Sequence, residues 1–167
     1  MDADIMTDAL RNLRINSDRM LAALNELAQI GSTGDGGVHR PSLSEAHLAA
    51  RKRFRDQIET SGLEFRTDGA GNHSAVCNVI ASPVWAKQSP VPLEIASRRL
   101  ATTEPKTLLL GSHLDSVPQG GRFDGALGVM AAFEVLRTIK DAGISLSVNL
   151  EAIDFTDEEG TLVGLLG

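Results

Sequence analysis

The spacing of apolar residues predicts two amphipathic helices in the first part of the chain. Residues 17–30 carry apolar side chains three or four positions apart, and Gly31 follows as a helix stop. A second helix is predicted from Ser42 to Gly62, because Ser42 and Glu45 form the Ser-x-x-Glu pattern of a capping box. The apolar face of this second helix consists of Ala46, Ala50, Phe54 and Ile58.

After Gly62 the apolar period shortens, which predicts strands. Residues 63–66 and 74–80 are short strand-like runs, and a glycine-rich turn over residues 68–72 separates them. Residues 81–105 contain several prolines and little periodicity, so we expect them to form an irregular surface excursion.

The last part of the chain has the pattern of a β–α–β unit. Residues 107–110 form a continuous apolar run, which is typical of a strand buried on both faces. Residues 124–142 have helical spacing and end at Gly143, and apolar and polar residues then alternate from 146 to about 155. This order predicts a parallel strand pairing, so we expect an α/β domain with helices packed on a mixed, largely parallel sheet.

Composition and charge narrow the class of protein. The 167 residues carry a formal net charge of −6 and are 42% apolar, which is typical of one acidic globular domain. An acidic chain with few aromatic residues is not expected to bind nucleic acid. No apolar run is long enough for a transmembrane helix, and the single Cys77 excludes an intramolecular disulfide, so we expect a cytoplasmic protein that binds no membrane.

Two short polar segments, residues 111–125 and 154–160, follow directly on predicted strands. In an open α/β sheet, ligands bind beyond the carboxyl ends of the strands. The side chains gathered there would be those of His113, Asp115, Asp124, Glu158 and Glu159. Imidazole nitrogens and carboxylate oxygens are ligands of zinc and its neighbours, so this edge of the sheet is a candidate metal site.

The positions of these side chains indicate separate roles. His113 lies just after a buried strand, and Asp115, two residues further on, would accept its second N–H and fix its tautomer. Asp124 has two carboxylate oxygens and could bridge two cations. Glu158 and Glu159 are adjacent and would diverge on extended backbone, so one would bind metal while the other would act as a base toward a metal-bound water.

Each of these residues also has a purely structural interpretation. His113 could be a hydrogen-bonded histidine at a strand end, Asp124 a helix N-cap, and residues 157–159 a solvated acidic turn. The conjunction of the two segments favours the metal site, because carboxylates grouped without a cation would repel one another.

The remaining polar residues are interpreted as structural. The basic run over residues 51–55 fans out around Phe54 on a helix, which indicates a solvated face and not a nucleic-acid patch. His39 and His47 are interpreted as surface or packing residues, His73 as a packing residue, and Cys77 as a small buried apolar side chain.

Three motifs carry the candidate residues: Gly-Ser-His113-Leu-Asp115-Ser-Val, Gly120-Gly121-x-x-Asp124-Gly125-x-x-Gly128-Val129, and Asp157-Glu158-Glu159-Gly160. Two further motifs lie upstream: Gly36-Gly37-Val38-x-Arg40 and Asp68-x-x-Gly71-Asn72. Together they resemble the M20 family of metallopeptidase-like amidohydrolases. Within that family they are similar to the branch of N-carbamoyl-L-amino acid hydrolases, β-ureidopropionases and allantoate amidohydrolases. The resemblance covers nearly the whole chain.

The resemblance implies a role for each candidate residue. His113 and Glu159 would each ligate one of two divalent metal ions, and Asp124 would bridge the two ions. Glu158 would be the general base that activates the water between the metals, and Asp115 would orient His113. The implied cofactors are two divalent ions, with zinc as the first choice and manganese or cobalt as alternatives.

The implied reaction is hydrolysis of a C–N bond in a linear amide or ureido compound, such as an N-carbamoyl amino acid, a ureido acid or allantoate. The substrate would be a small molecule with a carboxylate and an amide or ureido group, and the full-length enzyme would be a homodimer. Family members also contain further metal-binding histidines and a lid-like dimerisation domain. Residues 1–167 are therefore expected to be an N-terminal fragment, the incomplete part of a zinc-peptidase-like catalytic domain, inactive on its own.

Two other functions stay open on the sequence alone. One is a catalytically silent α/β module with an interaction or regulatory role. The other is a fragment of an M20-type aminopeptidase or aminoacylase. Retained metal would separate an enzyme from the silent module, and the substrate class would separate the two kinds of enzyme.

Overall fold

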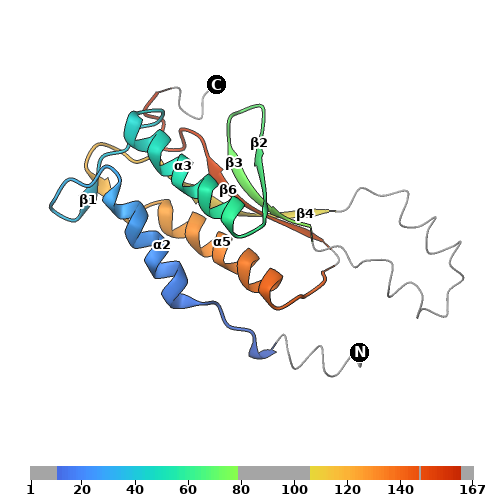
Figure 1. The fold of residues 1–167 in the computed structure, drawn as a ribbon. Coiled ribbons are helices and arrows are strands. Elements are labelled where there is room, and N and C mark those ends of the chain that lie inside the picture. Colours follow the sequence, from blue (N-terminus) through green and yellow to red (C-terminus); the bar gives the residue numbers. More distant parts are fainter. Residues whose placement is uncertain (1–10, 79–105, 147, 163–167) are drawn as a thin grey trace, which may run out of the picture.

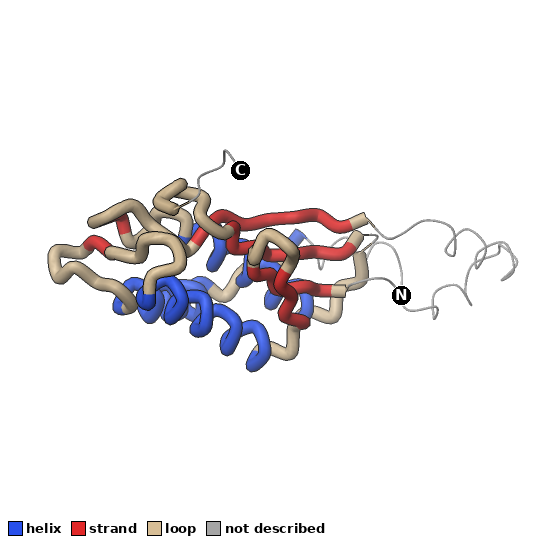
Figure 2. Tube along the Cα trace, turned by 90° about the horizontal axis from the view of Figure 1, so that it is seen from above, coloured by secondary structure: helices blue, strands red, loops and turns tan. Residues whose placement is uncertain are grey.

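The computed structural model describes residues 11–78, 106–146 and 148–162, so the expected excursion at residues 81–105 lies outside the described residues. Helices α2 (Ser17–Gln29), α3 (Glu45–Thr60) and α5 (Ala126–Asp141) lie on one face of a four-stranded sheet (Figure 1). Figure 2 shows these helices as one layer beside the layer of strands. The described residues thus form two layers, which confirms the predicted α/β class with helices packed on a sheet.

The sheet has the strand order β2–β3–β6–β4 and is mixed. β4 (Thr107–His113) runs parallel to β6 (Asn149–Phe155), and α5 connects them, which confirms the predicted β–α–β unit. β2 (Glu64–Thr67) and β3 (His73–Cys77) form an antiparallel hairpin, and β3 also pairs antiparallel with β6. This part of the sheet is less parallel than expected, because the short turn after β2 permits only an antiparallel hairpin.

The core lies between the sheet and the helices. Phe54 of α3 and Phe133 of α5 are fully buried and meet edge to face, with ring centroids 5.5 Å apart. Leu24 and Leu27 of α2 are also buried, in agreement with the predicted apolar face. Each such side chain stabilises the fold by about 1.5–3 kcal/mol. This packing fixes α5 against the sheet and thereby places its first turn at the end of β4.

The exposure of β4 corrects one prediction. Residues 107–110 were expected to be buried on both faces, but Leu108 is 51% exposed and Leu109 is 46% exposed. β4 is an edge strand, and in the described part of the chain the helices cover only one face of the sheet (Figure 2). The apolar run therefore predicted the strand correctly, but it did not predict the exposure of the strand to solvent.

The start of α3 corrects a second prediction. Ser44 is the N-cap, and its side chain accepts a hydrogen bond from the backbone N–H of His47 at 3.2 Å. Ser42 is buried instead, and its own N–H donates to Oγ1 of Thr161 at 2.9 Å. The Ser-x-x-Glu pattern thus misplaced the cap by two residues, because Ser42 is bound to the segment that follows β6.

A small second sheet links the N-terminal glycine loop to the loop after β4. β1 (Gly37–Val38) pairs antiparallel with β5 (Gly120–Gly121). Next to this pair, the N–H of Arg40 donates to Oγ of Ser116 at 2.9 Å, and the N–H of Ser116 donates to the carbonyl of Arg40 at 3.0 Å. These bonds hold Arg40 beside the segment that follows His113.

Candidate metal centre

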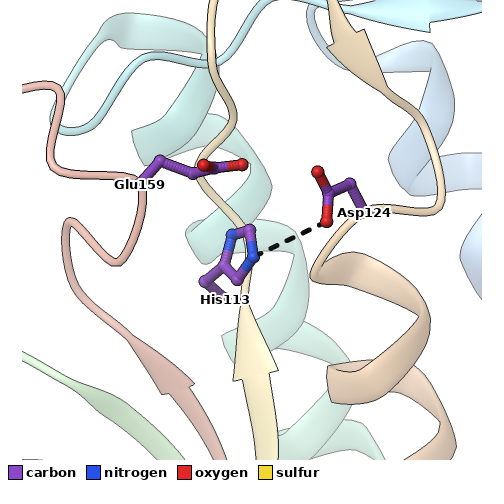
Figure 3. Close-up of side chains that lie close together, drawn as sticks. All are labelled: His113, Asp124 and Glu159. Atoms are coloured by element: carbon purple, nitrogen blue, oxygen red, sulfur yellow. Dashed lines mark ion pairs between the residues drawn. The ribbon is translucent and has the colours of Figure 1, made fainter.

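The two parallel strands bring both polar segments to one edge of the sheet. His113, the last residue of β4, lies beside Phe155, the last residue of β6. Residues 156–159 form a turn directly after β6. Figure 3 shows the side chains of His113, Asp124 and Glu159 pointing toward one another from the strand end and from the two loops.

The candidate ligand atoms lie close enough to share a metal ion. One ligand atom from each of His113, Asp124 and Glu159 lies within 4.8 Å of the other two. Nε2 of His113 is 3.9 Å from Oδ1 of Asp124 and 3.4 Å from Oε2 of Glu158. His113 is buried, Glu159 is half-buried and Asp124 is exposed, so the cluster opens to solvent on the Asp124 side.

Asp115 determines which imidazole nitrogen of His113 is available to a metal. Nδ1 of His113 lies 3.1 Å from the carbonyl oxygen of Asp115 and 3.5 Å from Oδ1 of its carboxylate. When Nδ1–H donates to these oxygens, Nε2 presents its lone pair toward Asp124. One imidazole nitrogen and two carboxylates form a donor set that fits zinc and related divalent ions. The nearer partner of Nδ1 is the backbone carbonyl, whereas the sequence pointed to the carboxylate.

The carboxylates around His113 shift its pKa. Burial acts to lower this pKa, but the side chain and carbonyl of Asp115 and the charge of Glu158 outweigh burial and raise the pKa to about 9. Burial also raises the pKa of Glu159; His113 opposes this rise, and the charges of Asp124 and Glu158 add to it. Carboxylates contribute to both rises, and an excess of carboxylates around one imidazole is an environment that attracts cations.

The turn after β6 differs from the extended backbone expected for the two glutamates. Asp157 has a positive φ of 58°, and its Oδ1 accepts the N–H of Leu162 at 3.1 Å. This bond helps to close the turn. Glu158 and Glu159 both lie near His113 as a result, so their division into base and ligand stays a prediction.

Asp124 does not cap α5, which removes its purely structural interpretation. The N-cap is Gly125, with φ 62° and no side-chain cap hydrogen bond. A Cβ atom at Gly125 would lie 2.4 Å from the carbonyl oxygen of His113 and 2.5 Å from its ring. Glycine is therefore required where the chain passes His113, and the Asp124 side chain is left 58% exposed beside it.

Three charged residues near the site are buried, and the sequence assigned none of them a role there: Arg40, Arg51 and Asp154. Nε of Arg51 donates to Oδ2 of Asp154 at 2.8 Å, so the prediction of a solvated face over residues 51–55 is wrong for Arg51. Burial raises the pKa of Asp154 to about 6, although Arg51 acts to lower it. The available signal was the alternation along β6, which places Asp154 on the same buried face as Leu150 and Ala152.

Comparisons with known proteins identify several relatives. A family model described as Peptidase family M28 matches residues 95–167. The N-carbamoyl-L-amino-acid amidohydrolase of Rhizobium meliloti is 32% identical over 89% of this chain, and the allantoate amidohydrolase of Bacillus subtilis is 31% identical over 81% of it. The crystal structure of a hydantoinase/carbamoylase family amidase from Burkholderia ambifaria matches 89% of this chain with a TM-score of 0.71 and 36% identity.

The chain corresponds to only part of each of these proteins. It spans 31% of the Rhizobium enzyme, 28% of the Bacillus enzyme and 31% of the Burkholderia chain. The relatives are N-carbamoyl-L-amino-acid and allantoate amidohydrolases, which is the branch that the sequence motifs resemble. The family model that matches, however, is M28 and not M20. Among the residues that the structure describes, none of the helices combines the length and the apolar character needed to cross a bilayer.

Proposed function

This chain is a homologue of the N-carbamoyl-L-amino-acid and allantoate amidohydrolases, and we propose that it forms the metal-binding part of a hydrolase of C–N bonds in linear amides or ureido compounds. The observation that carries the proposal is the convergence of one ligand atom each from His113, Asp124 and Glu159 within 4.8 Å. The substrate would be a small molecule with an amide or ureido group and a carboxylate.

His113, Asp124 and Glu159 would hold the metal, with Asp124 shared between two ions. Divalent ions bound there, with zinc as the first choice and manganese or cobalt as alternatives, would polarise the substrate carbonyl and lower the pKa of the attacking water. Three ligands are too few for two coordination spheres. We therefore propose that the complete site also uses ligands from outside the described residues.

Glu158 would take the proton from the attacking water. Its side chain is 43% exposed and its Oε2 lies 3.4 Å from Nε2 of His113, so the carboxylate reaches the same space as the ligand atoms while solvent can enter. Asp115 would keep Nδ1 of His113 protonated and so leave Nε2 to the metal. For an N-carbamoyl amino acid, water would add at the carbamoyl carbon and one of its two C–N bonds would break. The carbamic acid formed would then lose its remaining amine as carbon dioxide is released, so the products would be the amino acid, carbon dioxide and ammonia.

Metal content tests the site. The chain is equilibrated with zinc, manganese or cobalt, freed of unbound ions by dialysis, and analysed for metal per chain. We expect retained metal in the wild type and its loss in H113A and D124A. H39A and D56A are the controls, because His39 and the Asp56 side chain are exposed and stand outside the site. Equal traces of metal in all five proteins would overturn the proposal and favour a catalytically silent module.

A peptide substrate is the second candidate, and the match to Peptidase family M28 favours it. The two are separated by expressing the whole open reading frame that contains this chain. N-carbamoyl amino acids, allantoate and dipeptides are then supplied in parallel, and ammonia and free amino acids are measured. Release of amino acids from dipeptides without release of ammonia from the other substrates would assign the site to peptide hydrolysis.

A further inference from the structure

Leu114 stands between His113 and Asp115, and two buried charged side chains bind its backbone. Its N–H donates to Oδ1 of Asp154 at 2.8 Å, and its carbonyl accepts from Nε of Arg40 at 3.0 Å. Leu114, Arg40 and Asp154 are all fully buried. We call Arg40 and Asp154 the Leu114 clamp.

The end of the β-sheet ladder explains why the clamp is needed. The last pair of the parallel ladder is His113 with Phe155, so the N–H and carbonyl of Leu114 lie beyond the ladder. A buried peptide group without a partner costs free energy comparable to a lost hydrogen bond. Asp154, which lies in β6 opposite Ser112, reaches forward along the sheet and supplies the missing acceptor.

Each member of the clamp is anchored to another part of the fold. Oδ2 of Asp154 accepts from Arg51 of α3 at 2.8 Å, and Arg51 also donates to Oγ1 of Thr156 at 2.8 Å and to the carbonyl of Gly71 at 2.6 Å. The Arg51–Asp154 pair therefore connects α3, the β2–β3 turn and the end of β6.

Arg40 is anchored at the other end of the same peptide segment. Its Nη1 donates to the carbonyl of Leu27 at 2.8 Å, near the end of α2. Its backbone exchanges two hydrogen bonds with Ser116, two residues beyond Leu114. The peptide groups on both sides of Leu114 are thus tied to α2 and to α3, independently of any bond made by the imidazole of His113.

We propose that Arg40 and Asp154 are positioning residues of the metal centre, which fix the backbone of Leu114 and thereby the directions of His113 and Asp115. This inference rests on the proposed function. A buried ion pair is weak support for stability, because well-packed apolar side chains often replace one without loss. A peptide group that must be held at one orientation needs a hydrogen-bond acceptor and a donor at fixed places, and the clamp supplies both.

The test compares D154N and R40M with E134Q. Glu134 is a matched control, because it is also fully buried and ion-paired, with Arg19 and with Arg137 at 2.7 Å each. Glu134 lies eight residues beyond Ala126, the first residue of α5. It is therefore about 12 Å along the helix from the end of α5 that faces the site. For each protein we would measure the dissociation constant for Co²⁺ and Zn²⁺, the visible absorption of bound Co²⁺, and the free energy of unfolding.

We expect D154N and R40M to weaken metal binding roughly 10- to 100-fold and to alter the Co²⁺ spectrum, as loss of the outer partners of metal ligands does. E134Q should lose stability and keep both the metal affinity and the spectrum. Unchanged affinity and spectrum in D154N and R40M would overturn the inference. An equal loss of affinity in E134Q would also overturn it, because the effect would then follow stability alone.

One further variant and one further measurement keep the test decisive. If D154N does not fold, R40K replaces it: lysine keeps the charge and a donor, so the inference requires R40K to bind Co²⁺ more tightly than R40M. Hydrogen exchange of the Leu114 amide needs no metal and should speed up in D154N, because the single acceptor oxygen of the side-chain amide must serve both Arg51 and the Leu114 N–H, and not in E134Q. Metal binding that fails in the wild type overturns the proposed function, whereas normal binding in a variant with an unprotected Leu114 amide overturns only the inference.

Discussion

The carboxylate of Asp115 accepts a hydrogen bond from the backbone N–H of Glu159 at 3.3 Å. These residues are 44 positions apart and belong to the two polar segments of the site. With its other oxygen, Oδ1, the same carboxylate lies 3.5 Å from Nδ1 of His113. Asp115 is fully buried, so one side chain sets the relative position of two candidate ligands.

Replacement of Asp115 by alanine should weaken metal binding. We expect a loss of roughly 10- to 100-fold, because D115A frees both the imidazole of His113 and the backbone of Glu159. D115N keeps one acceptor oxygen and should lose less. Isothermal titration with Zn²⁺ measures the effect, and D141N is the control, since Asp141 is an exposed carboxylate on α5. Equal affinity in D115A and D141N would contradict the orienting role of Asp115.

Glu159 should stabilise the metal-loaded chain and destabilise the metal-free chain. Its pKa is raised by burial and by Asp124 and Glu158, so its ionised form is disfavoured in the folded state. A carboxyl group with a raised folded-state pKa costs stability as the pH rises through that pKa. E159Q should therefore unfold at a higher temperature than the wild type at pH 7 without metal.

Added Zn²⁺ should reverse that order. Binding to the folded state stabilises by RT ln(1 + [L]/Kd), which is about 2.7 kcal/mol at 100 times Kd. The wild type should gain this amount and E159Q much less. Thermal unfolding without Zn²⁺ tests the expected stabilisation by E159Q, and thermal unfolding with Zn²⁺ tests the larger gain of the wild type. E59Q is the control, because Glu59 is an exposed glutamate. A wild type that gains no more than E159Q would remove Glu159 from the set of ligands.

The sequence predicted the candidate site better than its surroundings. The convergence of His113, Asp124 and Glu159 follows from one rule, that parallel strands end at the same edge of a sheet, and the periodicity of residues 107–155 was sufficient to apply it. No distant contact had to be known. The fine geometry was less predictable, because the turn at Asp157 replaced the extended backbone that would have separated Glu158 from Glu159.

The buried charges beneath the site depend on contacts that a local pattern cannot contain. Arg51 and Asp154 are 103 positions apart, and only the packing of α3 on the sheet brings them together. Leu108 and Leu109 illustrate the same limit for burial. An apolar run reveals a strand, but its exposure depends on which elements cover it.

His47 should make the folded chain less stable as the pH decreases from about 6.5 toward 4. Burial, together with the nearby Arg51, lowers the pKa of His47 to about 4. His47 is fully buried, so of the two interpretations given to it, surface or packing, the structure supports packing, and Nδ1 of its ring accepts the N–H of Leu43 at 2.9 Å. In this interval the unfolded chain binds a proton at His47 and the folded chain does not. Each pH unit should therefore cost up to about 1.4 kcal/mol, or about 3 kcal/mol over the whole interval.

Urea unfolding at pH 7, 6, 5 and 4.5 measures this loss. H47N removes the titrating group and keeps an acceptor for the N–H of Leu43, so its stability should depend less on pH. H39N is the matched control at an exposed histidine and should follow the wild type. Parallel curves for H47N and H39N would show that His47 does not carry the pH dependence.

Gly125 should tolerate substitution poorly. Its φ is 62°, and a Cβ atom there would lie 2.4 Å from the carbonyl oxygen of His113, which is backbone and cannot move aside. Gly143 has nearly the same φ of 63° and open space around it. G143A should therefore cost only the left-handed backbone, about 1–2 kcal/mol, whereas G125A should add overpacking of about 1–3 kcal/mol. Urea unfolding gives both costs, and Zn²⁺ titration of folded G125A should show weaker binding, because relief of the clash displaces His113. Equal stability of G125A and G143A would mean that the approach of Gly125 to His113 is looser than the structure has it.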